Sequence, residues 1–558
     1  MNRILTSFLL AILSSAVSAQ NAYVPFDENT NHLIDRYAIL NQQSGFKGAT
    51  AIKPFNQRTV VDVIRRSADS VLPSVKEFNY QWLTVNNWDM MEESMQQSMY
   101  TKRSKWLPFF NYTGQLFTAK EKNFNVTVNP VIGLSSGMSN DEMIYRNTRG
   151  VTVRGQIDNK VGFHTFISEN QFFYPDFINS QIEQTEVIPG TGLIKTFGNG
   201  GYDFFQARGY ITFKPTKSID VQFGHDRNFI GNGYRSLILS DFAKENLFLK
   251  LRTRVWRVDY MNLFSELSDY RFRGVQGLRK KYAAFHYLNL AVIPGKLHVG
   301  VFENIVFARN DSTQQPGYEF NYLNPIIFYR AVEHGLNSSD NSFVGFDAKW
   351  NALRGVQLYS QFVLDEFHKN EIFGRTGSWV NKWAAQFGMK YLNVAGVSHL
   401  DLQVETNLVR PYMYTHFRMD QNWTHYNQPM AHPLGANFKE FLTIVRYQVK
   451  PRWSITAKYF NIVQGADSSL DSDIRFGGNV LATYRNRAQE TGIEIGDGVK
   501  RNIQILDVTT TFQLYQNLFF DARYVYRNEE AENPLPSFTN NMIILSARFC
   551  IDRQRYDY

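Results

Sequence analysis

Across residues 123–558, apolar and polar side chains alternate through one segment after another, and this period-two pattern limits the possible folds more than any other feature. In one such segment, Leu249 and Leu251 alternate with Lys250 and Arg252. Because successive side chains of a β-strand point to opposite faces, each segment has one apolar face and one polar, often charged, face. The sequence therefore predicts a protein built from β-strands.

The alternating segments are long, and short and long connections follow one another between them. The segments have roughly 10–14 residues, whereas strands of globular proteins typically have about 5–6. Short connections such as 158–159 and 450–451 alternate with long ones such as 308–341 and 409–437. Outer-membrane β-barrels are built with short periplasmic turns and long outer loops. A soluble β-sandwich, with its apolar faces inward, is the alternative.

The number of strands follows from a parity argument. About nineteen candidate strands are present if residues 111–118 are included, but single-chain bacterial barrels have an even number of strands. With short turns on the periplasmic side, 124–134 runs outward as the first strand, and 111–118 lies outside the wall or inside the lumen. We therefore predict an all-β transmembrane barrel of about eighteen antiparallel strands over residues 123–558, wide enough for an aqueous lumen.

The composition fits a barrel better than other classes of protein. The chain is 15% aromatic and 20% charged, and beyond the N-terminus it has no apolar run of about 18 residues that would predict a transmembrane helix. The lone cysteine, Cys550, excludes a disulfide scaffold. The net charge of +8 is spread out, without a dense block of Lys and Arg. We therefore expect no nucleic-acid partner.

The first residues have the pattern of an export signal. Arg3 precedes a mostly apolar run over 4–17, and small residues ending at Ala19 form a cleavage site before Gln20. Residues 1–19 are therefore predicted to be a signal peptide, with a retained anchor as the alternative. Export predicts the outer membrane of a Gram-negative cell, with membrane lipid, lipopolysaccharide and the barrel-assembly machinery as partners.

Residues 20–105 lack the alternation and show helical spacing instead. Helices are predicted over 32–40, 59–69 and 74–99. This helical unit is either a periplasmic cap that packs only on itself or a plug that fills the barrel. We favour the plug, because the lumen of an eighteen-stranded barrel is otherwise open. Residues 106–122 connect the helical unit to the barrel.

Charged residues on the polar faces of the strands are predicted to line the lumen. If the barrel is a channel, these charges set its ion selectivity. The predicted lumen-lining residues are Arg146, Arg154, Lys250, Arg252, Arg254, Asp401 and Glu405.

Three long connections combine planar polar groups with aromatic rings, as carbohydrate-binding sites do. Amides, carboxylates and guanidinium groups offer donors and acceptors that match vicinal hydroxyls, and aromatic rings offer flat apolar surfaces to sugar rings. The alternative at each position is that these groups join the loops to one another over the barrel. The candidates are Arg227, Asn228, Asn232, Tyr234, Arg235 and Asp241 in the first connection, Asn324, Arg330 and Glu333 in the second, and Trp423 and His432 in the third.

The aromatic residues divide into two expected groups. Trp453, Phe520 and Tyr524 fall on the apolar faces of strands, where contact with lipid and the membrane interface is expected. Tyr322 and Tyr329, like the loop candidates above, lie in outer connections that lipid does not reach. We expect these loop aromatics to form a surface that faces sugar.

No motif has the spacing of a metal site or a catalytic centre. His416, His425 and His432 share one connection, but their separations of nine and seven residues fit no compact metal site. Residues 334–340 contain His, Ser and Asp within a single loop, where geometry rarely permits a catalytic triad. We therefore predict a protein that is not an enzyme and that has neither metal nor cofactor.

Four segments of the barrel region resemble sequences of the capsule-assembly outer-membrane family Wzi: FGHDRNFIGNGYRSLILSDFA, YLNPIIFYRAVEHGLNSSDNSFVGFDAKW, YSQFVLDEF and HPLGANFKEF. These segments and the opening NAYVPFDENTNHLIDRYAI are most similar to the Bacteroidetes branch of the family, which includes the gliding-motility protein RemB. The resemblance covers nearly the whole chain, from about residue 30 to 558. It implies an eighteen-stranded barrel with a helical plug and a lectin-like role at the cell surface, either retaining exported polysaccharide or serving surface motility.

Two functions therefore remain open. The first is an outer-membrane surface protein that binds or retains polysaccharide, in capsule assembly or in gliding motility and adhesion. The second is a channel for small solutes or oligosaccharides. In the first function the partner is a surface polysaccharide held by the outer loops, whereas in the second the charges of the lumen act.

Overall fold

The computed structural model describes residues 22–558 except 42–47, 67–73, 101–112, 159, 199, 275–276, 309–316, 326–328, 330–331, 333–335, 337, 339, 367–375 and 469–472. The predicted signal peptide and its cleavage site therefore lie outside the described residues. Within the described residues, no helix combines the length and the apolarity needed to cross a membrane.

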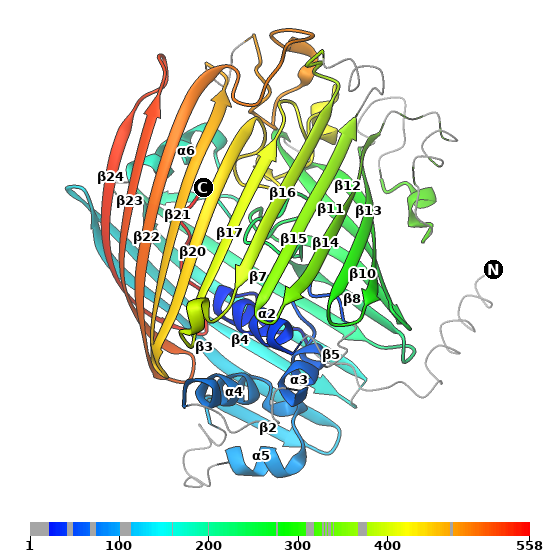
Figure 1. Cartoon of the computed structure of the whole chain (residues 1–558), viewed down its shortest axis with the longest axis vertical. Helices are drawn as coiled ribbons and strands as arrows, with labels where there is room; N and C mark the ends of the chain where they lie inside the picture. The colour runs from blue at the N-terminus through cyan, green and yellow to red at the C-terminus, as the bar shows by residue number, and fades with distance from the viewer. Residues whose placement is uncertain are drawn as a thin grey trace.

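Eighteen antiparallel strands of the described chain form a closed barrel, as the alternation predicts (Figure 1). Each strand pairs with the next along the chain, and the last closes the barrel by pairing with the first, with Phe549 opposite Ile132. The wall strands are β3 (Phe124–Ser139), β4 (Glu142–Ile157), β5 (Val161–Phe173), β7 (Gly201–Phe213), β8 (Ile219–Asp226), β10 (Asn246–Val255), β11 (Val258–Gly274), β12 (Gly277–Ile293), β13 (Leu297–Phe307), β14 (Asn341–Leu353), β15 (Val356–Glu366), β16 (Lys382–Tyr391), β17 (Leu400–Val409), β20 (Phe438–Lys450), β21 (Trp453–Ala466), β22 (Val499–Tyr515), β23 (Leu518–Ala531) and β24 (Phe538–Phe549).

A further short strand, β2 (Phe117–Glu121), extends the sheet at the end where the turns are short. It pairs with the first half of β3, with Phe117 opposite Val128, whereas the second half of β3 pairs with β24. The prediction that 111–118 lies off the wall is therefore wrong for Phe117 and Thr118. The physical reason is that β3 is longer than the edge β24 covers, so its free backbone groups pair with the preceding segment.

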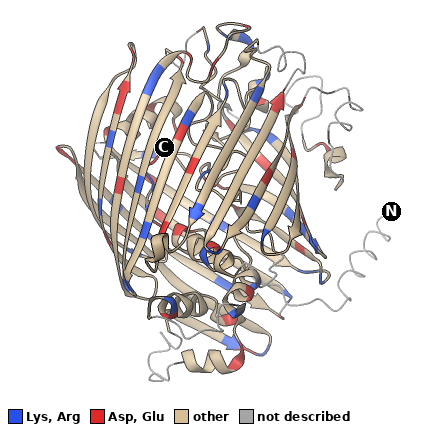
Figure 2. Cartoon of the chain, in the orientation of Figure 1, with Lys and Arg blue, Asp and Glu red and all other residues tan. Residues whose placement is uncertain are grey.

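On the strands, apolar side chains are exposed and polar side chains are buried, which is the opposite of the pattern in a soluble protein. Leu358 on β15 is 38% exposed and its neighbour Gln357 is 3% exposed. On β24, Ile543 is 64% exposed and Arg548 is 5% exposed. An outward apolar face is favourable only in contact with lipid, so the polar faces point into the lumen and a soluble β-sandwich is excluded. Figure 2 shows the charged residues spread along the strands.

The predicted lipid-facing aromatic residues are on the outer surface. Trp453, Phe520 and Tyr524 are among the exposed large side chains of the described residues. Rings at such positions contribute to the aromatic belts of outer-membrane barrels. Aromatic residues on the wall are therefore explained by the membrane and need no ligand.

The N-terminal segment, residues 22–100, forms helices at the end of the barrel where the turns are short (Figure 1). They are α2 (Glu28–Leu40), α3 (Gln57–Arg66), α4 (Ser74–Asn86), η2 (Trp88–Met90) and α5 (Glu93–Met99). Asp27 begins α2 by accepting a hydrogen bond from the backbone N–H of Thr30 at 2.8 Å. Ile34, Val60 and Leu83, from the first three helices, pack in one core with Phe519 of β23.

The single helix predicted over 74–99 is interrupted. The side chain of Asn87 donates a hydrogen bond to the carbonyl of Leu83 at 2.8 Å, so the chain turns after Asn86. This turn buries Trp88, whose Nε1 donates to the hydroxyl of Thr127 on β3 at 3.2 Å. An asparagine side chain that bonds to the backbone in this way ends a helix readily.

The inner face of β20–β24 is partly apolar, contrary to the prediction of polar inner faces throughout. Leu442 on β20 and Phe460 on β21 belong to a buried cluster that also contains Ile178 and Ile182. These two isoleucines lie on α6 (Asp176–Thr185), in the long connection between β5 and β7. α6 therefore folds into the barrel and covers an apolar patch on its inner wall (Figure 1).

Candidate functional site

In addition to α6, the parts of the described chain outside the wall that contact its inner face include the N-terminal segment, residues 227–245 (the inner loop) and residues 550–558 (the tail). Figure 1 shows α2 and the end of the chain within the outline of the barrel. The side with long connections is the extracellular side, because outer-membrane barrels carry their long loops there. The inner loop therefore enters the lumen from outside, and the helices cover the periplasmic end.

α2 is fixed to the wall by ion pairs with inward-facing strand residues. The carboxylate of Glu28 lies 2.6 Å from Nζ of Lys458 and 2.9 Å from the guanidinium of Arg446. Burial alone would raise the pKa of Glu28, but these two cations outweigh burial and hold the pKa well below its usual range. Asp35 pairs with Lys390 at 2.7 Å. α2 is therefore bonded to the wall and is not part of a cap that packs only on itself.

The inner loop approaches the wall most closely at Glu405. One carboxylate oxygen of Glu405 accepts a hydrogen bond from the backbone N–H of Tyr234 at 2.7 Å, and the other accepts one from that of Arg235 at 3.1 Å. A Cβ atom on Gly233 would lie 2.5 Å from the same carboxylate. Only glycine permits this approach, which explains the residue type at that position.

Arg235 occupies the centre of a buried charge network. Its guanidinium lies 3.2 Å from Glu440 on β20 and 3.4 Å from Asp557 of the tail. Burial alone would lower the pKa of Arg235, but the two carboxylates raise it above its usual value. Nε2 of His432 lies 2.8 Å from Glu440. All four side chains are almost fully buried, so the network joins loop, tail and wall and is closed to ligands.

The N-terminal segment and the inner loop are linked by backbone pairing. β1 (Ile52–Lys53) and β9 (Phe229–Ile230) form an antiparallel pair, with Ile52 opposite Ile230. The Nζ atom of Lys53 donates to the carbonyl of Gly231 at 3.2 Å. Burial lowers the pKa of Lys53 to about 8. A segment from the periplasmic end is thus continuous, through hydrogen bonds, with a loop from the extracellular end.

The tail is held between the inner loop and the wall. The guanidinium of Arg555 lies 2.6 Å from Asp241 of the inner loop, and the hydroxyl of Tyr234 donates to Asp557. Burial would raise the pKa of Asp557, but Arg235 and the other cations near it lower the pKa to about 2. The tail follows β24 and has no alternating pattern, and the sequence reasoning therefore missed its role.

The first group of predicted carbohydrate-binding residues lies in the lumen and not at the barrel mouth. Asn228 accepts a hydrogen bond from Nζ of Lys250, and Asn232 accepts one from the hydroxyl of Thr50, each at 3.0 Å. These polar groups bond to the wall and the N-terminal segment, because the polar side chains of the lumen supply hydrogen-bond donors and acceptors in place of water. The expectation that they lie in an outer loop above the barrel is therefore wrong for Arg227, Asn228, Asn232, Tyr234, Arg235 and Asp241, which lie inside it.

The loop aromatics do not form an exposed surface. Tyr322 and Tyr329 are fully buried, and Trp423 is 4% exposed. The prediction that these rings face sugar is wrong for all three, because the rings fill the interior of the loops. Of the remaining candidates, Asn324 is exposed, His432 is buried against Glu440, and Arg330 and Glu333 lie outside the described residues.

The predicted lumen-lining residues face inward and contact the chain that occupies the lumen or the neighbouring strand. Asp401 accepts a hydrogen bond from Arg36 and lies 3.0 Å from Nε2 of His32, both on α2. Arg252 pairs with Asp259 at 2.6 Å on the neighbouring strand. The set with this placement is Arg146, Arg154, Lys250, Arg252, Arg254, Asp401 and Glu405.

The three histidines of the 409–437 connection make separate hydrogen bonds. Nδ1 of His425 accepts from the backbone N–H of Ser268 at 2.9 Å, and Nδ1 of His416 accepts from that of Arg418 at 3.3 Å. His432 is bonded to Glu440, as described above. Among the described residues, no three His, Cys, Asp or Glu side chains are grouped so as to hold a metal ion.

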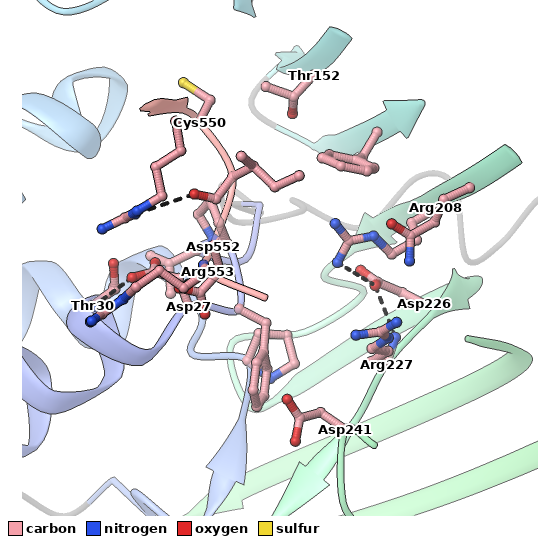
Figure 3. Close-up of a pocket in the computed structure, with 18 of the residues that line it drawn as sticks. Asp27, Thr30, Thr152, Arg208, Asp226, Arg227, Asp241, Cys550, Asp552 and Arg553 are labelled. Carbon is pink, nitrogen blue, oxygen red and sulfur yellow. Dashed lines mark hydrogen bonds and ion pairs between the residues drawn. The ribbon is translucent and has the colours of Figure 1, made fainter. Parts of the chain in front are cut away.

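A cavity of about 280 Å³ lies between the N-terminal segment, the tail, the inner loop and the wall strands β3–β7. Its lining extends from Asn86 on α4 to Gly190 in the connection between β5 and β7. Figure 3 shows two charged groups beside it, Arg208, Asp226 and Arg227 on one side and Asp27, Asp552 and Arg553 on the other. The cavity therefore extends along the lumen and is rich in charge.

On the extracellular side, residues 484–490 form a short stretch that we call the surface segment. Backbone hydrogen bonds hold it against the loop that precedes β16 and against an earlier part of its own connection. The N–H of Trp379 donates to the carbonyl of Glu490 at 3.1 Å, and the N–H of Arg475 donates to that of Asn486 at 2.8 Å. The ring of Tyr484 lies 4.7 Å from that of Trp379. The conformation of the segment is therefore fixed before any ligand binds.

The side chains of the surface segment remain available to ligands. Arg485 and Asn486 are exposed, whereas the guanidinium of Arg487 lies 4.3 Å from the ring of Trp379 and is ion-paired with the exposed carboxylate of Glu490 at 2.5 Å. They present planar donors and acceptors beside half-buried rings, the combination that the sequence analysis sought elsewhere. The run YRNRAQE carries this signal in the sequence, but nothing in the run itself distinguishes it from a solvated turn.

The chain was compared with known families and structures. The model of the family Capsule assembly protein Wzi matches residues 134–541. The solved structure of Wzi from Escherichia coli matches with a TM-score of 0.58 and 12% identity, over 95% of this chain and 100% of that one. That protein is described as an outer-membrane protein involved in group 1 capsule assembly and a carbohydrate-binding β-barrel. No curated protein sequence matches the chain.

Two other barrels are less similar in structure. OprD from Pseudomonas aeruginosa matches with a TM-score of 0.42 and 11% identity, over 76% of this chain and 94% of that one. OccAB2 from Acinetobacter baumannii matches with a TM-score of 0.41 and 10% identity, over 76% of this chain and 97% of that one. The match to the family model covers well over half of the sequence, and the chain belongs to the Capsule assembly protein Wzi family of outer-membrane β-barrels.

Proposed function

We propose that the protein binds polysaccharide at the outer surface of the cell and retains it there during capsule assembly. Membership of the Wzi family supports this role, as does the carbohydrate binding described for the Escherichia coli barrel. The observation that carries the proposal is the surface segment, where exposed planar groups stand on a backbone fixed by its neighbours. The proposal assigns no catalytic step to the protein.

The geometry of the surface segment suits a repeating sugar chain. Guanidinium, amide and carboxylate groups each present two atoms side by side, which matches the spacing of neighbouring hydroxyls. Because the segment is bonded to another loop and to an earlier part of its own connection, little conformational entropy is lost when a ligand binds. A polymer that contacts several such groups at once binds more tightly than one sugar unit, since each further contact is intramolecular.

The alternative of an open channel is less well supported. α2, the inner loop and the tail contact the inner wall at successive levels, and α6 covers an apolar patch nearer the outside. A channel requires a continuous aqueous path. We infer that the N-terminal segment acts as a plug and that the barrel serves to display its outer loops.

The proposal is tested by replacing exposed groups of the surface segment. In the double variant R485A/R487A, retention of polysaccharide by whole cells should fall at least threefold, measured by labelling of surface sugar. The matched control is the double variant K450A/R452A, which removes the same two positive charges from exposed positions at the periplasmic turn between β20 and β21. Equal retention by R485A/R487A and the control would contradict the proposal.

The resemblance to the gliding-motility branch adds a finer proposal. The retained polysaccharide, or the loops themselves, would then serve adhesion during movement of the cell over a surface. A clean deletion should be scored both for polysaccharide retention and for spreading. Loss of retention alone assigns the protein to capsule assembly, and loss of spreading alone assigns it to motility.

A further inference from the structure

The cavity in the lumen has an excess of positive charge. Its lining contains seven arginines and four aspartates, an excess of three positive charges, together with His164. Two of these arginines, Arg208 and Arg227, keep side-chain exposures of 18% and 20% although they lie within the closed barrel. Their exposed surface therefore faces the space inside the lumen.

Most of the nearby arginines form a direct ion pair with a carboxylate, but two do not, although Glu28, Asp507, Asp521 and Asp552 act on Arg553 from a greater distance. Arg548 lies 2.7 Å from Asp521, and Arg555 lies 2.6 Å from Asp241. Among the described residues, by contrast, neither Arg146 nor Arg553 has a carboxylate within 4.0 Å, the limit for an ion pair. These two guanidinium groups line the same cavity and also share a smaller adjoining pocket.

The contacts of Arg146 position it without neutralising it. Its Nε donates to the hydroxyl of Thr148 at 3.1 Å, and Nη1 donates to the backbone carbonyl of Asp552 at 3.4 Å. The guanidinium carbon lies 5.3 Å from the centre of the Phe172 ring. These contacts hold the planar group in place while leaving donors free. The Arg553 side chain makes no hydrogen bond within the described part of the chain.

Two guanidinium groups without a direct ion pair, in a cavity lined by more arginines than aspartates, favour an anion. Removing a charge from bulk water is costly unless an opposite charge or hydrogen bonds compensate for it. Guanidinium groups match a carboxylate particularly well, because their paired N–H groups fit its two oxygens. The rings of Tyr23, Trp82 and Phe172 also line the cavity and offer flat apolar surfaces.

The size of the cavity limits what it accepts. Its volume of about 280 Å³ is close to the lower end of small-molecule pockets, about 300 Å³. That space suits a single sugar unit and excludes a folded chain of several units. A carboxylate on the sugar would meet the two arginines while the ring lies against an aromatic side chain.

We propose that this cavity binds one carboxylate-bearing sugar unit, a hexuronate, with Arg146 and Arg553 as the carboxylate-binding residues. The site is distinct from the surface segment and lies inside the barrel. That the ligand is a saccharide rests on the proposed function, whereas the preference for an anion rests on the two arginines alone. Residues of the wall, the tail and the N-terminal segment complete the site.

The test is calorimetric titration of the full-length protein in detergent with sodium glucuronate. The double variant R146Q/R553Q should raise the Kd for glucuronate at least tenfold, which corresponds to about 1.4 kcal/mol. Arg149→Gln is the matched control, because Arg149 lies on the same strand, β4, but is exposed on the outer side. Circular dichroism and thermal unfolding should show that both variants remain folded.

Two further ligands separate the parts of the proposal. Glucose and acetate should each bind at least tenfold more weakly than glucuronate. If acetate binds as tightly as glucuronate, the proposal that the ligand is a sugar is wrong. If glucose binds as tightly as glucuronate, the proposed role of the carboxylate is wrong. Absence of glucuronate binding, or equal binding by R146Q/R553Q and the wild type, would overturn the site.

This experiment is independent of the test of the surface segment. The R485A/R487A variant should bind glucuronate in the lumen with a Kd within twofold of the wild-type value. If that variant retains polysaccharide normally while R146Q/R553Q loses glucuronate, the proposed function fails and the luminal site stands. If only the R485A/R487A variant shows a loss, the luminal site fails and the proposed function stands.

Discussion

The guanidinium of Arg235 lies 3.2 Å from the carboxylate of Glu440, and this contact joins the inner loop to the barrel wall. Both side chains are almost completely buried, and removing one partner leaves the other charge without full compensation. Breaking a buried ion pair in this way typically costs about 3–5 kcal/mol. The position of the inner loop therefore depends on a contact between residues that are 205 positions apart in the sequence.

Arg235→Met should lower the free energy of unfolding by about 3–5 kcal/mol, because Glu440 is left buried beside His432. Denaturant titration in detergent, followed by tryptophan fluorescence, measures the change. Glu92→Gln is the control, since its pair with Arg65 in the periplasmic helical segment is more than half exposed to solvent and should contribute at most about 1 kcal/mol. Equal effects of the two substitutions would contradict the importance of the buried pair.

The raised pKa of Asp27 should make the stability of the folded protein depend on pH. Burial, together with the nearby carboxylate of Asp552, raises the pKa of Asp27 to about 6. Between pH about 4 and 6 the folded protein then binds more protons at this group than the unfolded chain does. Its contribution to stability is therefore fully present at the acid end of that range and is lost as the pH rises through 6.

Asp27→Asn should remove this dependence while keeping an oxygen that caps α2. The Tm of the variant should exceed that of the wild type at pH 7.5, and the difference should shrink or reverse at pH 4.5. Thermal unfolding at the two pH values measures it, with Asp158→Asn in an exposed turn as the control. A difference in Tm that does not change with pH would show that Asp27 titrates as it does in the unfolded chain.

Because chain segments occupy the lumen, we expect the barrel to conduct ions poorly. In planar bilayers the intact protein should give no large, stable current steps. Removing residues 22–100 and replacing residues 231–243 with a short Gly-Ser linker should produce steps of the size expected for an open barrel of this width. Steps of that size from the intact protein would instead favour the channel.

Trp88 anchors the N-terminal segment to the start of the barrel. Its side chain is 1% exposed, and Trp88→Ala should cost about 3–5 kcal/mol, as expected for a large ring removed from a core. Trp256 lies in a turn and is 71% exposed, so Trp256→Ala should change stability by less than about 0.5 kcal/mol. Denaturant titration of the two variants distinguishes the roles of the rings.

The wall of the barrel is predictable from sequence because its physical rule is local. Leu358 and Gln357 are adjacent, and their opposite exposures follow directly from the geometry of a strand beside lipid. Connection lengths then determine which end faces outward. The same local rule fails on β20–β24, where Leu442 and Phe460 point inward, because an inward apolar residue is explained only by α6, about 260 residues earlier in the chain.

The contents of the lumen are harder to predict. Asn232 and Arg235 bond to wall residues much as they would to water, so their polarity alone does not distinguish an exposed loop from one inside the barrel. Tyr322 raises the same difficulty for aromatic residues. A tyrosine that packs inside a folded loop cannot be told by its residue type from a tyrosine that binds sugar. In the surface segment, the backbone bonds that fix Arg485 and its neighbours come from segments about 10 and 100 residues away, and these bonds appear only in three dimensions.

The pairing of β1 with β9 has a mechanical consequence. A pull on the N-terminal segment from the periplasm loads the bonds between Ile52 and Ile230, and from there the tension reaches a loop whose two ends leave the wall at its extracellular rim. The wall shares that load, because α2 is also bonded to Lys458 and the inner loop to Glu405. The pairing of β1 with β9 is thus a direct tie, inside the barrel, between a segment from the periplasmic end and a loop from the extracellular end.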